Sequence, residues 1–198
     1  MYFKKLISTI FLMMFLGGSL LAQNVTLNIQ GEPQMRIDGE ANVRSWDAAV
    51  EQVEGTLVMA EVEEMTLDSL SADLFKEMTL TIPVESIQSG SGGLTKNIHK
   101  YLHADDHPTI TFTLNEVTDI SVEGDSAMIT ASGVINANGV DSDVTMQVTA
   151  SMNADGSVNF QGEQELLMTS FDVDPPTAIF GTVRARDEMI ISYNVNFN

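Results

Sequence analysis

The three histidines of the chain lie four residues apart, at His99, His103 and His107. On one continuous helix they would share a face, and two histidines at this spacing can hold a metal ion. Pro108 and the polar residues 104–106 indicate instead that a helix ends near His103, so that His107 belongs to the start of a strand. We therefore expect no metal site and no cofactor, and interpret the histidines as a surface cluster near the mouth of the fold.

The acidic and hydroxyl side chains form no catalytic grouping. Aspartate and glutamate number 28, so neighbouring carboxylates are frequent, but none stands alone beside an apolar stretch as a tuned catalytic acid requires. No Gly-x-Ser-x-Gly sequence is present, and the glycine-rich residues 89–93 lack the lysine of a phosphate-binding loop. Residues 141–143 lack the downstream glutamate of a calcium loop. We predict that the protein is not an enzyme.

The charge of the chain limits its partners. The formal net charge is −19 at pH 7, and such a surface repels phosphate groups. We therefore expect no nucleic-acid partner, and the charge also disfavours docking on anionic lipid head groups. The acidity is interpreted as a solvated surface that favours solubility.

The first residues have the pattern of a secretory leader. Lys4 and Lys5 precede a short apolar run over residues 6–16, and small residues lead to Ala22. The run is shorter than the roughly 20 residues that a membrane-spanning helix needs. The pattern predicts a signal peptide over 1–22 that is cleaved after Ala22, one domain over 23–198, periplasmic or secreted localisation, and no stable membrane anchor.

The rest of the chain alternates between apolar and polar residues, which is typical of antiparallel strands that cover a core on one side. Turn residues separate the strand-like runs at positions 123–125, 138–139 and 155–156. Many sequential strands in one domain must close or stack to hide their edges. Residues 94–102 have their apolar positions on one side and predict a helix, and residues 68–76 predict one or two helical turns.

The order of these pieces resembles the YceI-like family of exported proteins. The resemblance rests on residues 35–46, 84–90, 94–102, 107–112, 133–140, 144–148 and 187–189. It implies an all-β fold, an antiparallel lipocalin-like barrel of about eight strands with a short helical insertion. It also implies that the barrel holds a polyisoprenoid, an isoprenoid quinone or another long apolar lipid. Asn42, Arg44 and Ser45 depart from the histidine-rich first strand of the better known branch, so the ligand itself stays open.

An eight-stranded barrel has room for its own side chains or for one small ligand. The chain has 12 methionines, and methionine adapts to an irregular apolar guest. The alternative is a filled core, in which case the protein is a structural or interaction module that works through its acidic surface. Oligomeric state also stays open, with a dimer as one possibility. Taken from the alternation, the expected apolar lining consists of Met78, Leu80, Ile82, Ile110, Phe112, Leu114, Ile135, Val144, Met146, Val148, Met189, Ile191 and Tyr193, with Met152 as a further inward residue.

Three other residues have two readings each. Arg184 and Arg186 could contact an anionic head group at the rim of the barrel, but pairing with the abundant acidic residues is the simpler expectation. Trp46 could stack on a ligand, although a single tryptophan at a strand end is usually part of a core.

Overall fold

The computed structural model describes residues 23–178 and 180–198. The predicted signal peptide therefore lies outside the described residues. Within the described part, no helix has the length and apolar character needed to cross a membrane.

The chain is mostly strand, as the period-two alternation predicts, because an apolar residue at every second position gives a strand one face for the core. Within residues 23–178 and 180–198, one α-helix and four short 3-10 turns interrupt the strands. The elements are β1 (Asn24–Ala41), β2 (Ser45–Val50), β3 (Glu54–Ala60), η1 (Leu67–Ser69), η2 (Ala72–Leu74), β4 (Phe75–Pro83), η3 (Val84–Ser86), β5 (Ile87–Gln88), α1 (Gly92–Tyr101), β6 (Thr109–Glu123), β7 (Ser126–Ala137), β8 (Val140–Met152), β9 (Val158–Leu167), η4 (Met168–Phe171), β10 (Thr177–Ala178) and β11 (Val183–Phe197).

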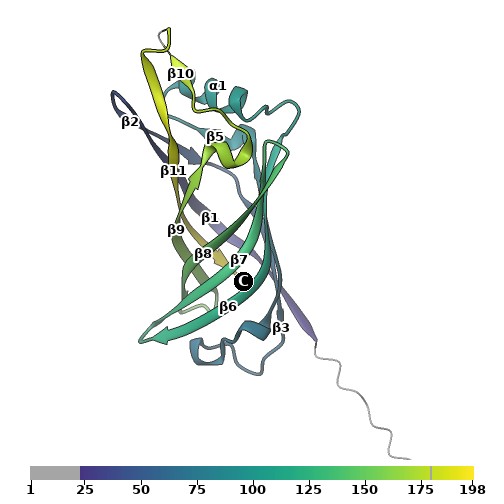
Figure 1. Cartoon of the computed structure of the whole chain (residues 1–198). Helices are drawn as coiled ribbons and strands as arrows, with labels where there is room; N and C mark the ends of the chain where they lie inside the picture. The colour runs from purple at the N-terminus through teal and green to yellow at the C-terminus, as the bar shows by residue number, and fades with distance from the viewer. Residues whose placement is uncertain (1–22, 179) are drawn as a thin grey trace, which may run out of the picture.

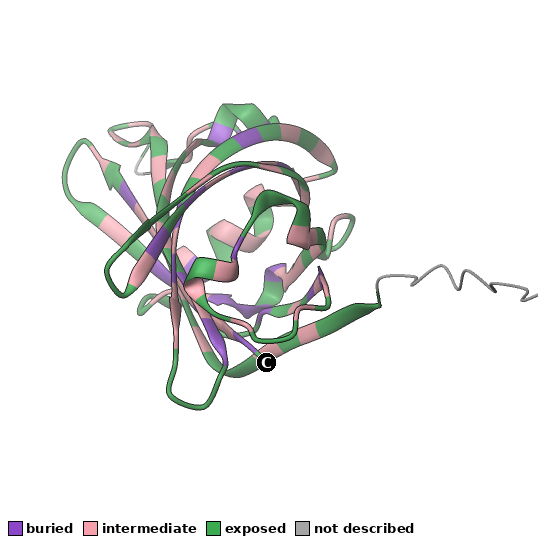
Figure 2. Cartoon of the chain, turned by 90° about the horizontal axis from the view of Figure 1, so that it is seen from below, coloured by how far each residue is buried: buried purple, intermediate pink, exposed green. Residues whose placement is uncertain are grey.

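Eight of the strands form a closed antiparallel barrel (Figure 1), in the order β11-β9-β8-β7-β6-β4-β3-β1, and β1 pairs with β11 to close it. Viewed end-on, these strands form a ring (Figure 2). The predicted lipocalin-like architecture is confirmed. Closure removes the exposed sheet edges that sequential strands would otherwise leave.

The first strand holds the barrel and a short side sheet together. Its first half pairs with β3, from Asn24 opposite Ala60 onward, and its second half pairs with β2, from Met35 opposite Val50 onward. β2 in turn pairs with β5. The change of partner follows Gly31, whose φ of 74° favours glycine. One long strand therefore supplies both the barrel wall and the sheet that flanks α1.

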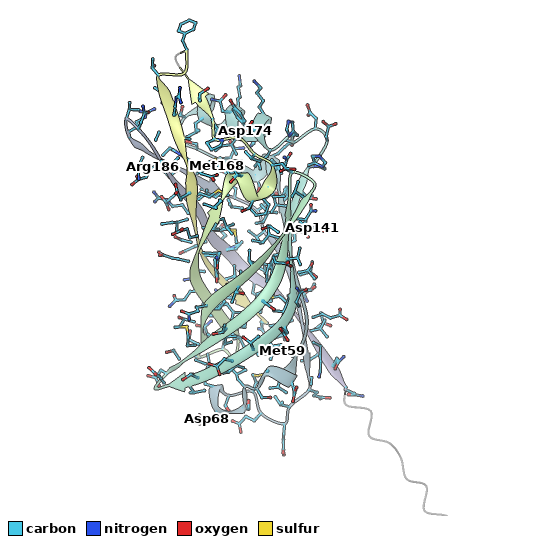
Figure 3. The ribbon with its side chains drawn as sticks, in the orientation of Figure 1. Met59, Asp68, Asp141, Met168, Asp174 and Arg186 are labelled. Atoms are coloured by element: carbon cyan, nitrogen blue, oxygen red, sulfur yellow. The ribbon has the colours of Figure 1, made fainter. Side chains whose placement is uncertain are left out.

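The two ends of the barrel differ. At one end, η1 and η2 cover a packed core that contains Leu57, Met59, Leu70 and Phe197. The ring of Phe197 meets that of Phe160 edge-on, with centroids 5.9 Å apart. At the other end lie α1, η4 and the β10–β11 hairpin (Figure 1). The labelled side chains Met59 and Met168 mark these two ends in Figure 3.

The predicted turns and helices occur where the sequence places them. Asn138 and Gly139 have φ values of 53° and 75°, the conformation of the tight hairpin turn that Asn-Gly favours. The predicted helix over 94–102 corresponds to α1, and the predicted turns over 68–76 correspond to η1 and η2. The side chain of Thr66 caps η1.

One boundary in the barrel wall is only partly paired. β7 pairs with β8 from Ala127–Ala150 to Ala137–Val140, but β8 pairs with β9 only from Met152–Val158 to Thr149–Gln161. Towards the α1 end, β8 and β9 diverge, and η4 lies there (Figure 1). Beyond Thr149 and Gln161, the edges of β8 and β9 that face each other therefore have no ladder partner.

Candidate functional site

The barrel encloses a cavity of about 690 Å³ between the packed core and α1. Its floor is formed by buried Phe160 and Val195. At the α1 end the lining includes the exposed residues Arg44, Asn97 and Thr177, so the cavity has a mouth there. A mostly apolar pocket with few polar groups and this volume is typical of a small-molecule site.

Twelve of the thirteen residues expected from the alternation line this cavity. They come from β4, β6, β7, β8 and β11. Successive side chains of a strand point to opposite faces, so every second residue of these strands points into the barrel. Val144 is buried but does not contribute to the lining, and Met152 packs against the core cluster at the closed end. The twelve are Met78, Leu80, Ile82, Ile110, Phe112, Leu114, Ile135, Met146, Val148, Met189, Ile191 and Tyr193.

Further residues line the cavity besides those expected from the alternation, and they include Trp46, for which contact with a ligand was one of two readings. Met35 and Ile37 of β1 face the cavity, as does Trp46 of β2. The alternation over 35–39 could have indicated the β1 pair. Trp46 is half-buried, so it lines the cavity as well as packing in the wall.

The helix α1 covers the mouth with its apolar side. Leu94, Ile98 and Leu102 line the cavity, whereas Lys96 and Lys100 are exposed. The hydroxyl of Thr95 accepts a hydrogen bond from the amide of Ser89 at 2.9 Å, which ties the start of the helix to the strand before it. The amphipathic pattern thus positions α1 as a cover.

The turn η4 forms the other part of the cover. Met168 and Phe171 are buried and line the cavity. The Asn138 side chain donates to the carbonyl of Phe171 at 3.0 Å, and Thr169 donates through its amide and hydroxyl to the carboxylate of Asp187 at 2.9 and 2.6 Å. No periodic pattern in the sequence pointed to these residues, since their placement depends on contacts with distant strands.

The three histidines lie near the mouth and have separate contacts. The Nε2 atom of His99 is 2.9 Å from the carbonyl oxygen of Ile87, and the Nδ1 atom of His103 is 2.6 Å from the Oδ1 atom of Asn138. His107 packs against Gly139. In the described part of the chain, no three histidine, aspartate or glutamate side chains are grouped to hold a metal.

The arginines near the rim differ in their contacts. Arg186 pairs with Glu40, with 2.9 Å between Nη1 and Oε2, as expected from the excess of acids. Arg184 donates from Nε to the carbonyl of Gly181 at 3.0 Å. Neither side chain lines the cavity wall, whereas Arg44 does, at the mouth.

Deep in the cavity, one polar group has no partner. The hydroxyl of Tyr193 is buried, and no hydrogen bond to it is found among the described residues. Burial raises the pKa of this hydroxyl to about 12, because the charged form is poorly solvated there. Tyr193 is therefore a neutral potential donor inside a mostly apolar site.

Comparison with known families decides how this barrel is classified. The family model of the YceI-like domain matches residues 20–197. The chain belongs to the YceI-like family. The earlier resemblance is thereby confirmed over nearly the whole chain.

Several solved structures share the fold. Burkholderia cenocepacia BcnA superposes with a TM-score of 0.62 at 18% identity, covering 83% of this chain and 95% of that chain. A polyisoprenoid binding domain from Saccharophagus degradans, implicated in plant cell wall breakdown, gives 0.64 at 9% identity, covering 87% and 97%. The Campylobacter jejuni YCEI protein gives 0.54 at 14% identity, covering 79% and 82%. No curated protein matches the YceI-like chain in sequence.

Proposed function

We propose that this protein binds a long apolar lipid, of the polyisoprenoid or isoprenoid quinone type, inside its barrel and carries or stores it outside the cytoplasm. The observation that carries the proposal is the cavity of about 690 Å³ with its apolar lining. Each methylene buried there contributes roughly 0.8 kcal/mol, so a long tail gains affinity without hydrogen bonds, less the cost of ordering it.

Two findings support this reading over the alternative of a filled core. The interior is hollow on the α1 side of the barrel, and a packed core lies at the η1–η2 end. The chain also shares its fold with a polyisoprenoid binding domain. A module that acts only through its acidic surface would not need a cavity whose mouth is covered by the apolar side of α1.

Export remains part of the proposal. It is supported by the basic and apolar pattern of residues 1–22. An N-terminal sequence of the mature protein that begins at Gln23 would agree with cleavage after Ala22.

The test is to place a charge in the cavity wall. Met146 lines the cavity, and the adjacent Gln147 on the same strand is exposed. A buried carboxylate is costly, so we expect Met146→Glu to weaken binding of a fluorescent isoprenoid at least tenfold and to remove any lipid seen by native mass spectrometry. The matched control Gln147→Glu should bind as the wild type does.

A second variant keeps the test valid if Met146→Glu does not fold. Ala131 is buried and lines the cavity, so Ala131→Phe should fill space without adding charge. If both variants fold, as judged by circular dichroism, and both retain wild-type affinity, the proposed function is wrong.

A further inference from the structure

Tyr193 sits near the floor of the cavity. On β11 the lining residues run from Val183 at the mouth to Val195 at the floor, and Tyr193 is the last inward position before Val195. Its neighbours across the sheet are Met35 on β1 and Gly162 on β9. Any ligand that fills the cavity must approach this side chain.

Gly162 makes room for the tyrosine ring. A Cβ atom at position 162 would lie 2.6 Å from the hydroxyl oxygen of Tyr193 and 3.0 Å from the carbonyl oxygen of Gln147. The hydroxyl therefore reaches across β9 towards β8. The paired part of these two strands ends at Thr149 and Gln161, one position before Gly162.

The hydroxyl is thus buried next to the place where the β8–β9 ladder ends. Buried side-chain polar atoms nearly always have a partner, yet no partner is present for this one in the described part of the chain. A phenylalanine would give the same ring packing without leaving a donor unpaired. Close by, Gln164 also lines the cavity, and its amide donates to the carbonyl of Glu165 at 3.0 Å.

The surroundings define the kind of ligand atom that would fit. Among the described lining residues, Arg44 alone carries a formal charge, and it lies exposed at the mouth. An ionised group at the floor would therefore be desolvated without a counter-charge. A neutral oxygen is compatible with the site, because it accepts a hydrogen bond at little cost.

We propose that the Tyr193 hydroxyl donates a hydrogen bond to an uncharged oxygen of the bound lipid, a carbonyl or a hydroxyl, so that the oxygen-bearing end lies at the floor and the tail points to the mouth. This inference rests on the proposed function and adds to it a ligand class and an orientation. A pure hydrocarbon would fill the same space but leave the donor unsatisfied.

The test compares Tyr193→Phe with the wild type on two probes, geranylgeraniol and the hydrocarbon of the same length without the hydroxyl. A hydrogen bond of ordinary strength corresponds to about 3- to 10-fold in affinity. We expect the variant to bind the alcohol 3- to 10-fold more weakly and the hydrocarbon as tightly as the wild type does, or more tightly. Ser192, the neighbour of Tyr193 on β11, does not line the cavity, and the control Ser192→Ala should change neither affinity.

The outcomes separate the two proposals. If the wild type binds neither probe, the lipid-binding function fails and this inference fails with it. If both probes bind but Tyr193→Phe alters their affinities by the same factor, or alters neither, the oxygen contact is refuted while lipid binding stands. Circular dichroism and urea unfolding of the variant establish that the comparison is made on folded protein.

Discussion

The indole ring of Trp46 lies directly against the backbone of Gly39 on the neighbouring strand. The two residues are opposite each other in the β1–β2 ladder, and a Cβ atom on Gly39 would clash with Cζ2 of Trp46. Trp46 lines the cavity. Because Gly39 has no side chain, the indole ring can lie in this position and form part of the cavity wall.

Replacing Gly39 with alanine should therefore displace the indole ring. Overpacking of this kind costs about 1–3 kcal/mol, and we expect the free energy of unfolding in urea to fall by that amount. Gly90 has no atom within 4 Å of its added Cβ, so Gly90→Ala serves as the control and should change stability by less than about 0.5 kcal/mol. Equal effects at the two positions would contradict the proposed packing.

The chain has a single tryptophan, and it lines the cavity. Intrinsic fluorescence should therefore report binding directly, because a lipid that displaces water from the indole changes its environment. We expect titration with an isoprenoid to shift the emission maximum to shorter wavelength and to saturate. Trp46→Phe should abolish the signal while mass spectrometry still detects the complex. A bound lipid with an unchanged emission spectrum would place the ligand elsewhere.

Asn138 joins three elements at the mouth. Its φ of 53° lies in the left-handed region, and its side chain contacts Phe171 and His103. Asn138→Gly keeps the backbone conformation but loses both contacts, which should cost about 1–3 kcal/mol. Asn138→Ala should cost about 1 kcal/mol more, because alanine is strained at this φ. Urea unfolding measures both, and an alanine variant as stable as the glycine variant would contradict the strain argument.

Burial of Tyr193 should make stability fall at alkaline pH. Its pKa is raised from 10.0 to about 12 in the folded protein, so the folded state holds the proton more tightly than the unfolded state does. The contribution is fully present below pH 10 and is lost as the pH rises from about 10 to about 12. At about 1.4 kcal/mol per pKa unit, the loss amounts to about 2–3 kcal/mol.

The measurement for that loss is urea unfolding of the wild type and Tyr193→Phe across this pH range. Other groups also titrate in this range, so the effect of Tyr193 is the difference between the free energies of unfolding of the two proteins. We expect the wild type to lose stability more steeply than Tyr193→Phe as the pH rises. Parallel curves for the wild type and Tyr193→Phe would show that Tyr193 ionises as freely in the folded protein as in the unfolded chain.

Much of the cavity wall could be predicted from the sequence because strand periodicity is local. Met78, Leu80 and Ile82 are two residues apart, and residues at this spacing in a strand always share one face. The same holds for Asn138 and Gly139, whose residue types favour one hairpin turn. Closure of the barrel followed from the number of sequential strands together with the family resemblance.

The part of the cavity lining that could not be predicted depends on contacts between distant parts of the chain. Met168 and Phe171 belong to a four-residue turn with no periodicity of its own, and their position depends on hydrogen bonds to residues 138 and 187. Val144 shares the inward face of β8 with Met146, yet it is excluded from the cavity lining. Alternation identifies the inward side chains but does not indicate which of them other elements will cover.

The pairing of the first and last strands has a consequence for how the protein matures. Ile29 is opposite Phe197, and the backbone of Asn28 exchanges hydrogen bonds with that of Asn198. This closing contact joins residues that are nearly the whole chain apart, which slows folding because a long loop must be ordered first. The cavity is thus enclosed only after β11 has been synthesised, and a chain that stops before β11 has no closed barrel in which to retain a lipid.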